Sequence, residues 1–153
     1  MLEALLLLGG IEVKLGFLDE AEERFSMLIE WDNDDAEAFA SLGHIAYLRE
    51  DYKQGQLFLA KALEIRPDHG GFQFLMAQTL AKSKKISRAV VHARKATRFT
   101  PESAECHLLL GDLLFKRGMK AAANEAWEQA LSLNPDLEYL VDKTRKKRKR
   151  QAE

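Results

Sequence analysis

Apolar residues recur along this chain at spacings of three and four positions, which is the period of an amphipathic helix. The pattern breaks at regular intervals and predicts eight helices arranged in four consecutive pairs. The first helices of the pairs are expected near 2–15, 36–49, 70–83 and 104–117. The second helices are expected near 18–31, 52–65, 86–99 and 120–133. A proline follows each of the last three second helices and prevents it from continuing: Pro67, Pro101 and Pro135.

The four pairs align with one another at a fixed period of 34 residues. Small residues occupy one position of every first helix: Gly9, Gly43, Ala77 and Gly111. Small residues also occupy one position of every second helix: Ala21, Gly55, Ala89 and Ala123. A period of this length indicates stacked helix–turn–helix repeats, here about 2–35, 36–69, 70–103 and 104–137. We therefore expect an all-α solenoid in which each repeat buries its apolar face against its neighbours.

Residue types at particular offsets predict how the paired helices pack and turn. The small residues of the two helices are expected to face each other and let the axes approach closely. Large residues should fill the space around them: Phe25, Leu59 and Trp127 at one offset, and Trp31, Ile65, Phe99 and Leu133 at another. Gly16 and Gly118 fall between paired helices, where positive φ is often required. Because Glu50 and Lys84 stand in the same turns without glycine, those turns are expected to be strained.

The two ends of the array differ. Residues 138–153 are expected to form a capping helix that runs into a basic tail, with Asp136 as its N-cap. Its apolar stripe, formed by Leu137, Leu140 and Val141, should cover the open end of the fourth repeat. The first repeat begins almost at Met1, so its leucines have no preceding helix to cover them. Either the chain is one segment of a longer protein, or this end is a docking or self-association surface.

The repeating pattern resembles the tetratricopeptide repeat family across residues 2–137. The fourth repeat matches the family motif at Leu110, Gly111, Gly118, Ala123, Trp127, Ala130 and Pro135. The second repeat matches at Phe39, Leu42, Gly43, Tyr52, Ala62 and Pro67. The resemblance implies a right-handed superhelix whose first helices line a concave groove. Such a groove takes a peptide or helix of another protein, so the implied function is that of a protein–protein interaction scaffold or adaptor.

Family geometry implies three rows of groove residues along the first helices. The first row is Leu6, Ala40, Phe74 and Leu108; the second is Gly10, His44, Gln78 and Asp112; the third is Val13, Tyr47, Ala81 and Phe115. Two rows are mainly apolar, and the middle row is polar at its last three positions. The implied ligand is an apolar segment whose polar groups are held by the middle row.

Two known groove types within the family offer a comparison. The carboxylate clamp of heat-shock co-chaperones needs lysine, arginine and asparagine at fixed groove offsets, and no alignment of the repeats supplies that set. The small chaperones of bacterial type III secretion instead hold hydrophobic segments of secreted subunits, and this chain is similar to them in size and groove polarity. A chaperone of that kind is therefore an alternative function.

Charge is distributed unevenly, although the formal net charge is only −1. Seven of the 23 basic side chains lie within residues 143–150: Lys143, Arg145, Lys146, Lys147, Arg148, Lys149 and Arg150. This tail could bind nucleic acid or an acidic partner. It could equally be a solvated end of the last helix, where cations favour the helix dipole. The sequence leaves both interpretations open.

No motif for catalysis, a cofactor or a metal ion occurs in the sequence. The histidines lack metal-ligand spacing, and no glycine pair belongs to a phosphate-binding loop. We therefore expect a protein that is not an enzyme and that uses no cofactor. The single cysteine, Cys106, suits a reducing compartment, and no apolar run approaches the roughly 20 residues of a membrane span. These features predict a cytoplasmic location.

Overall fold

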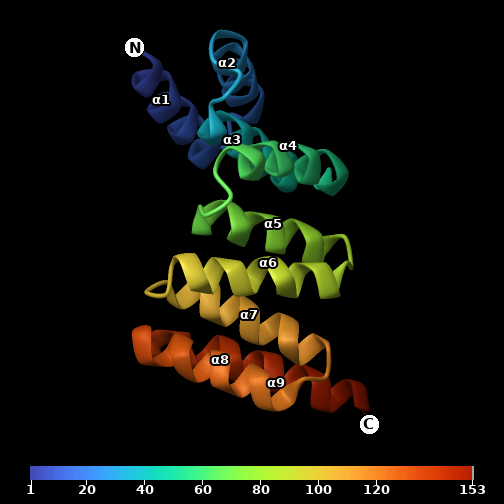
Figure 1. Cartoon of the computed structure of the whole chain (residues 1–153). Coiled ribbons are helices and arrows are strands. Elements are labelled where there is room, and N and C mark those ends of the chain that lie inside the picture. Colours follow the sequence, from blue (N-terminus) through green and yellow to red (C-terminus); the bar gives the residue numbers. More distant parts are fainter. Residues whose placement is uncertain (153) are drawn as a thin grey trace.

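The computed structural model describes the backbone of residues 1–152 and the side chains of residues 1–146, and within that range the chain is an all-α solenoid (Figure 1). The first helices of the four pairs are α1 (Leu2–Leu15), α3 (Ala36–Leu48), α5 (Gly70–Lys82) and α7 (Ala104–Lys116). The second helices are α2 (Leu18–Trp31), α4 (Tyr52–Ile65), α6 (Ile86–Phe99) and α8 (Lys120–Leu133). A short 3-10 helix, η1 (Pro135–Leu137), leads into α9 (Glu138–Ala152). The helix bounds expected from the sequence agree with these to within one residue.

The hydrophobic core runs along the stack instead of filling one centre. One cluster of buried side chains joins the second, third and fourth pairs and ends on Val141 of α9. A smaller cluster joins the first pair to α3 through Phe25, Leu28, Leu42 and Ile45. Each pair therefore depends on its neighbours for burial, as expected for a solenoid.

The closest packing between paired helices sets glycine against a large side chain. A Cβ added at Gly9 would lie 2.6 Å from Cζ of Phe25, and one at Gly111 would lie 2.4 Å from Cδ1 of Trp127. In the second pair the two small residues face each other as expected, since a Cβ at Gly55 would lie 3.3 Å from the carbonyl oxygen of Gly43, whereas in the first and fourth pairs a large ring is nearest to the glycine. Phe25 and Trp127 lie one turn after the small residue of their own helix, and helical side chains lean back towards the N-terminus. Their rings therefore fill the space over the glycine.

Three of the large residues expected inside the stack lie on its surface. Trp31, Phe99 and Leu133 are exposed, whereas Ile65 at the same offset is half-buried. All four residues end their helices, where a turn follows and fewer side chains can cover them. The expectation of burial is therefore wrong for Trp31, Phe99 and Leu133.

The turns inside the pairs share one backbone conformation. Each turn contains one residue with positive φ: 86° at Gly16, directly after α1, and 62° at Glu50, 61° at Lys84 and 83° at Gly118, each the second residue after its helix. Backbone hydrogen bonds close these turns, for example from Asp51 N to Ala46 O at 2.9 Å. Glu50 and Lys84 therefore carry the left-handed strain that the sequence predicted.

Replacing Glu50 and Lys84 by glycine is expected to stabilise the protein by about 0.5–1 kcal/mol per site, because relief of left-handed strain exceeds the entropy cost of glycine. Urea unfolding followed by circular dichroism measures the change. Gly118→Ala is the matched control and should lower the free energy of unfolding by a similar amount. Destabilisation by both glycine variants would contradict the argument.

The last helix covers the end of the stack. Val141 is fully buried, and Leu137 and Leu140 are half-buried. The expected N-cap, Asp136, lies inside η1, and the N-cap of η1 is Asn134, whose side chain accepts a hydrogen bond from Asp136 N at 3.1 Å. Pro135 occupies the first helical position, where its missing N–H costs nothing, so the cap is the residue before it.

Candidate peptide-binding face

The three rows of residues expected to bind a partner lie on α1, α3, α5 and α7, at spacings of three and four that place them on one side of each helix. We call this surface the first-helix face. Most of its side chains are half-buried, namely Leu6, Val13, His44, Tyr47, Phe74, Gln78, Leu108, Asp112 and Phe115. Half-burial leaves each of them in contact with the stack and still partly open to solvent.

Aromatic rings gather on α3 and the start of α4. The Tyr47 ring lies 6.4 Å from the His44 ring and 5.9 Å from the Tyr52 ring, measured between centroids. Burial lowers the pKa of His44, so its imidazole is neutral near pH 7. A neutral imidazole offers one donor and one acceptor, which suits recognition of a peptide backbone.

The fourth pair contributes less to an open surface than the sequence implied. Leu108 and Phe115 pack against the main core cluster, and the Phe115 ring lies 5.2 Å from the Trp127 ring. The carboxylate of Asp112 accepts a hydrogen bond from Trp127 Nε1 at 3.0 Å. These residues therefore support the end of the stack as well as lining the face.

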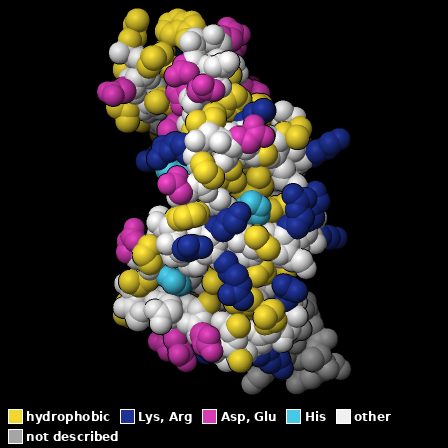
Figure 2. All heavy atoms as spheres, in the orientation of Figure 1, with side chains coloured by type: hydrophobic (Ala, Val, Ile, Leu, Met, Phe, Trp, Pro, Cys, Tyr) yellow, Lys and Arg dark blue, Asp and Glu magenta, His cyan; other side chains and the backbone are white. Residues whose placement is uncertain are grey.

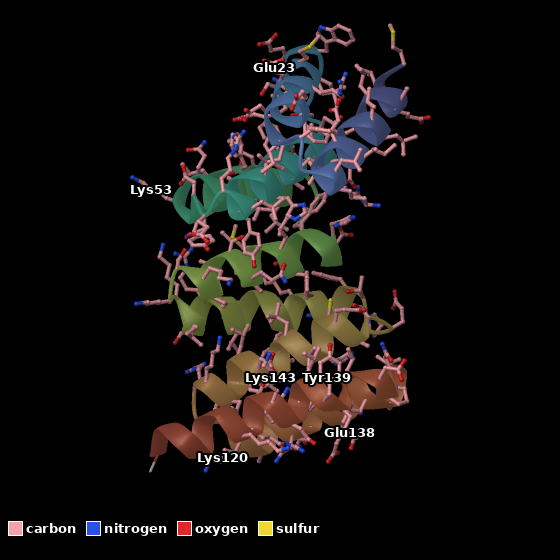
Figure 3. All side chains as sticks on the ribbon, turned by 180° about the vertical axis from the view of Figure 1, so that it is seen from behind. Glu23, Lys53, Lys120, Glu138, Tyr139 and Lys143 are labelled. Carbon is pink, nitrogen blue, oxygen red and sulfur yellow. The ribbon has the colours of Figure 1, made fainter. Side chains whose placement is uncertain are left out.

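Helix α9 adds Tyr139, which the sequence analysis did not consider, next to Lys143 of the basic tail. Seen from behind, α9 lies in front of the last helical pair, and Tyr139 and Lys143 are one turn apart along it (Figure 3). Tyr139 is 67% exposed. An aromatic residue followed four positions later by a cation was the available sequence signal, but only the placement of α9 shows that both stay accessible.

Burial raises the pKa of Asp112, although hydrogen bonds from Trp127 and Thr144 and the charge of Lys116 oppose the shift. The folded state thus disfavours the charged carboxylate more than the unfolded state does. Wild type should gain stability from this group as the pH falls through the raised pKa towards its ordinary value.

Asp112→Asn is accordingly expected to raise the melting temperature at pH 7, with a difference from wild type that shrinks towards pH 4. Asparagine can still accept the bond from Trp127. Thermal unfolding from pH 4 to pH 8 checks this, with Asp136→Asn, an exposed residue, as the control. A difference that grows as the pH falls would contradict it.

The described part of the basic tail is partly engaged in packing. Arg145 Nη2 donates to Asn124 Oδ1 at 2.9 Å, and its guanidinium carbon lies 5.1 Å from the centroid of the Trp127 ring. Lys143 and Lys146 are exposed. The side chains of Lys147, Arg148, Lys149 and Arg150 lie outside the described residues.

A second basic surface lies on α6. Residues 70–103 contain seven basic and one acidic side chain, whereas residues 1–35 contain two basic and ten acidic ones. Figure 2 shows the basic side chains gathered over the middle of the stack and acidic ones over its first pair. Four exposed cations lie along α6, and none of them forms an ion pair inside the described part of the chain: Arg88, Arg94, Lys95 and Arg98. Counting charge per repeat would have located this surface.

Other cavities and clusters are modest. A cavity of about 160 Å³ next to Phe74 is bounded by the start of α7, including Cys106. A hollow of about 390 Å³ lies between α6, α7 and α8. Within residues 1–146, no three histidine, cysteine, aspartate or glutamate side chains come close enough to hold a metal ion. No described helix combines the length and apolar character needed to cross a membrane.

Comparison with known proteins gives one consistent result. Tetratricopeptide repeat family models match residues 36–69 and 104–137. DnaJ homolog subfamily C member 7 from Mus musculus is 25% identical over 100 residues, which cover 65% of this chain and 20% of that protein. The human protein of the same name matches equally. The chain thus spans about one fifth of these curated relatives.

Solved structures share the fold at low sequence identity. MamA aligns with a TM-score of 0.79 at 18% identity, covering 88% of this chain and 79% of MamA. PilF from Pseudomonas aeruginosa aligns with a TM-score of 0.83 at 23% identity, covering 88% of this chain and 61% of the other. YrrB, described as a TPR protein with an unusual peptide-binding site, gives 0.75 at 19% identity, covering 86% and 68%.

Proposed function

We propose that this chain, which belongs to the tetratricopeptide repeat family, binds an apolar peptide or helix of another protein on its first-helix face. The repeats and the related proteins place the chain among protein–protein interaction scaffolds in general. A catalytic role is not part of the proposal, and the cytoplasmic location stays a prediction.

One observation carries the proposal. Tyr47 and Phe74 on consecutive first helices, together with His44 and Gln78, form a mixed aromatic and polar surface that the core only half covers. Aromatic side chains supply large contact areas at low entropic cost, and the neighbouring polar groups can pair with a peptide backbone. Asp112 already bonds to Trp127, so we place the centre of the site on α3 and α5.

A random peptide library displayed on phage, selected on the immobilised protein, tests this proposal without a known partner. Enriched peptides should be apolar, and Tyr47→Ala/Phe74→Ala should weaken their binding by at least about tenfold, as expected when two aromatic anchors are removed. Leu57→Ala/Val91→Ala is the matched control, because both residues are exposed on second helices. Circular dichroism should show equal helicity for all variants.

Peptides that bind the double variant as tightly as wild type would refute the proposal, and so would a selection that enriches nothing. A chaperone for hydrophobic secreted subunits, similar to those of type III secretion, would be one biological form of the same site. Enriched sequences that are amphipathic helices would favour that form over an extended peptide.

The cations of α6 support a second candidate function, binding of an acidic partner on the opposite helices. This shifts the anionic-partner hypothesis from the tail towards α6, where four charges have no described ion-pair partner. Binding to a poly-glutamate peptide should be lost in Arg88→Gln/Lys95→Gln and fall steeply with salt. Lys143→Gln/Lys146→Gln should have the larger effect if the tail is responsible.

A further inference from the structure

A second apolar surface lies on α1, along a different row from the first-helix face. We call it the α1 stripe, and its members are Ala4, Leu7, Leu8, Ile11 and Leu15. Spacings of three and four residues align these side chains along one side of the helix. All five are exposed, with Leu7 at 71% and Leu15 at 65%. A continuous apolar row of this kind on a helix surface marks an interaction site.

The later repeats show what normally covers this row. Leu42 and Ile45 stand 34 residues after Leu8 and Ile11, and they are only 4% and 1% exposed, against 42% and 52%. Their cover is the preceding second helix, α2, whose Phe25 and Leu28 share a core cluster with them. The α1 stripe is thus a surface built for a helix, and no described helix lies on it. In Figure 1, α1 and α2 together form the N-terminal end of the stack.

The charged residues beside the α1 stripe indicate which kind of helix can pack on it. Glu3 and Lys14 lie along the same edge of the stripe, near its two ends, and neither has an ion pair within the described residues. Their midpoint falls between Leu8 and Gly9, close to the middle of the stripe. A two-fold axis perpendicular to α1 at that point would set Glu3 of each copy opposite Lys14 of the other. A parallel two-fold pairing would instead carry the charged edges of the two copies to opposite sides of the interface, where Glu3 and Lys14 could not pair.

We propose that two copies of this chain associate through their α1 stripes, with the two α1 helices packed antiparallel. The stripe can pair its apolar side chains with those of a second copy, and the antiparallel direction is the one that pairs the flanking charges. The inference is independent of the proposed function, because the stripe and the first-helix face occupy different sides of α1. Such a dimer would hold two first-helix faces in one particle and would strengthen binding to a partner with two motifs.

Sedimentation equilibrium of the whole chain from 1 to about 100 μM tests for the dimer, since weak but specific contacts fall in this range. Wild type should dimerise, and Leu7→Gln/Ile11→Gln should raise the dissociation constant at least about tenfold, given the apolar area removed. Leu57→Gln is the matched control, because Leu57 is 58% exposed on α4 and far along the chain. Both exposed substitutions should leave the helicity unchanged.

Charge exchange tests the antiparallel direction. Glu3→Lys alone opposes two lysines across the dyad, and Lys14→Glu alone opposes two glutamates, so each homodimer should weaken by roughly fivefold to tenfold. An equimolar mixture should form a heterodimer of about wild-type affinity, because every flanking pair is then attractive. The effect should diminish at high salt.

Three results would overturn the proposal. The first is wild type that remains monomeric at about 100 μM, the upper end of the range in which a weak specific dimer should form. The second is a dimer that Leu7→Gln/Ile11→Gln leaves intact, and the third is a pair of charge variants that do not prefer each other. A stripe covered by a helix from another protein would give the first result.

Discussion

Replacing Trp127 with alanine is expected to lower the free energy of unfolding by about 3–5 kcal/mol, the largest effect of any single substitution considered for this protein. The Trp127 side chain is fully buried, its ring contacts Phe115, and its Nε1 donates to Asp112. Removing it leaves a cavity between α7 and α8 and takes one hydrogen bond from the half-buried carboxylate of Asp112, and both penalties act on the same pair.

Trp127→Ala should also weaken the packing of α9 against the rest of the stack. The Trp127 ring lies under the guanidinium of Arg145, so the indole is part of the surface on which α9 rests. Amide hydrogen exchange should therefore accelerate in α9 and α8 before it does in α3 and α4, because the repeats of a solenoid are coupled mainly to their neighbours. Urea unfolding and exchange measured by mass spectrometry together check both parts of this prediction.

Two variants separate the loss of packing from the loss of the hydrogen bond to Asp112. Trp127→Phe keeps an aromatic ring and loses the hydrogen bond, so it should cost only about 1–2 kcal/mol. Trp31→Ala removes the other tryptophan, which is exposed, and should change stability by less than about 0.5 kcal/mol. A loss in Trp127→Ala as small as that in Trp31→Ala would show that the indole does not organise the fourth pair.

Gly111→Ala is expected to destabilise the protein by about 2–3 kcal/mol, the second largest effect, even though alanine favours helices more than glycine does. The new methyl group would lie 2.4 Å from Cδ1 and 2.5 Å from Nε1 of Trp127. The indole is fully enclosed and cannot move aside, so α7 and α8 must separate. The melting temperature should therefore fall by several degrees.

Gly10→Ala provides the control for Gly111→Ala. Nothing lies within 4 Å of a Cβ built at Gly10, so there the substitution should stabilise the helix by about 0.5–1 kcal/mol. Opposite signs at two helical glycines would show that steric contact, and not helix propensity, decides the outcome. Equal signs would contradict the packing described for Gly111.

Much of the candidate site could be placed from the sequence, but its working part could not. The repeat period located the residues of the first-helix face on their helices, and family geometry assigned them to rows, with Phe74 in the first and Tyr47 in the third. Whether a side chain is free for a ligand depends on contacts between elements. The position of Asp112 in the repeat predicted a ligand-binding group. Only the packing of α7 against α8 shows that its carboxylate accepts a hydrogen bond from Trp127.

Local physics explains what the sequence by itself determined. Helix bounds, the positive φ at Gly16 and Gly118, and the strained turns at Glu50 and Lys84 follow from periodicity and backbone sterics within a few residues. The 34-residue period then required a solenoid, since no single repeat can bury its own apolar face.

Tertiary structure alone decided the remaining features. It set the Phe25 and Trp127 rings over glycines, and it placed Arg145 on the stack instead of in a free tail. It also showed Ile11 exposed although its counterpart Ile45 is buried. The physical reason is the same in each case: burial and pairing are properties of two elements in contact, and the residue type at one position does not specify which neighbour it meets.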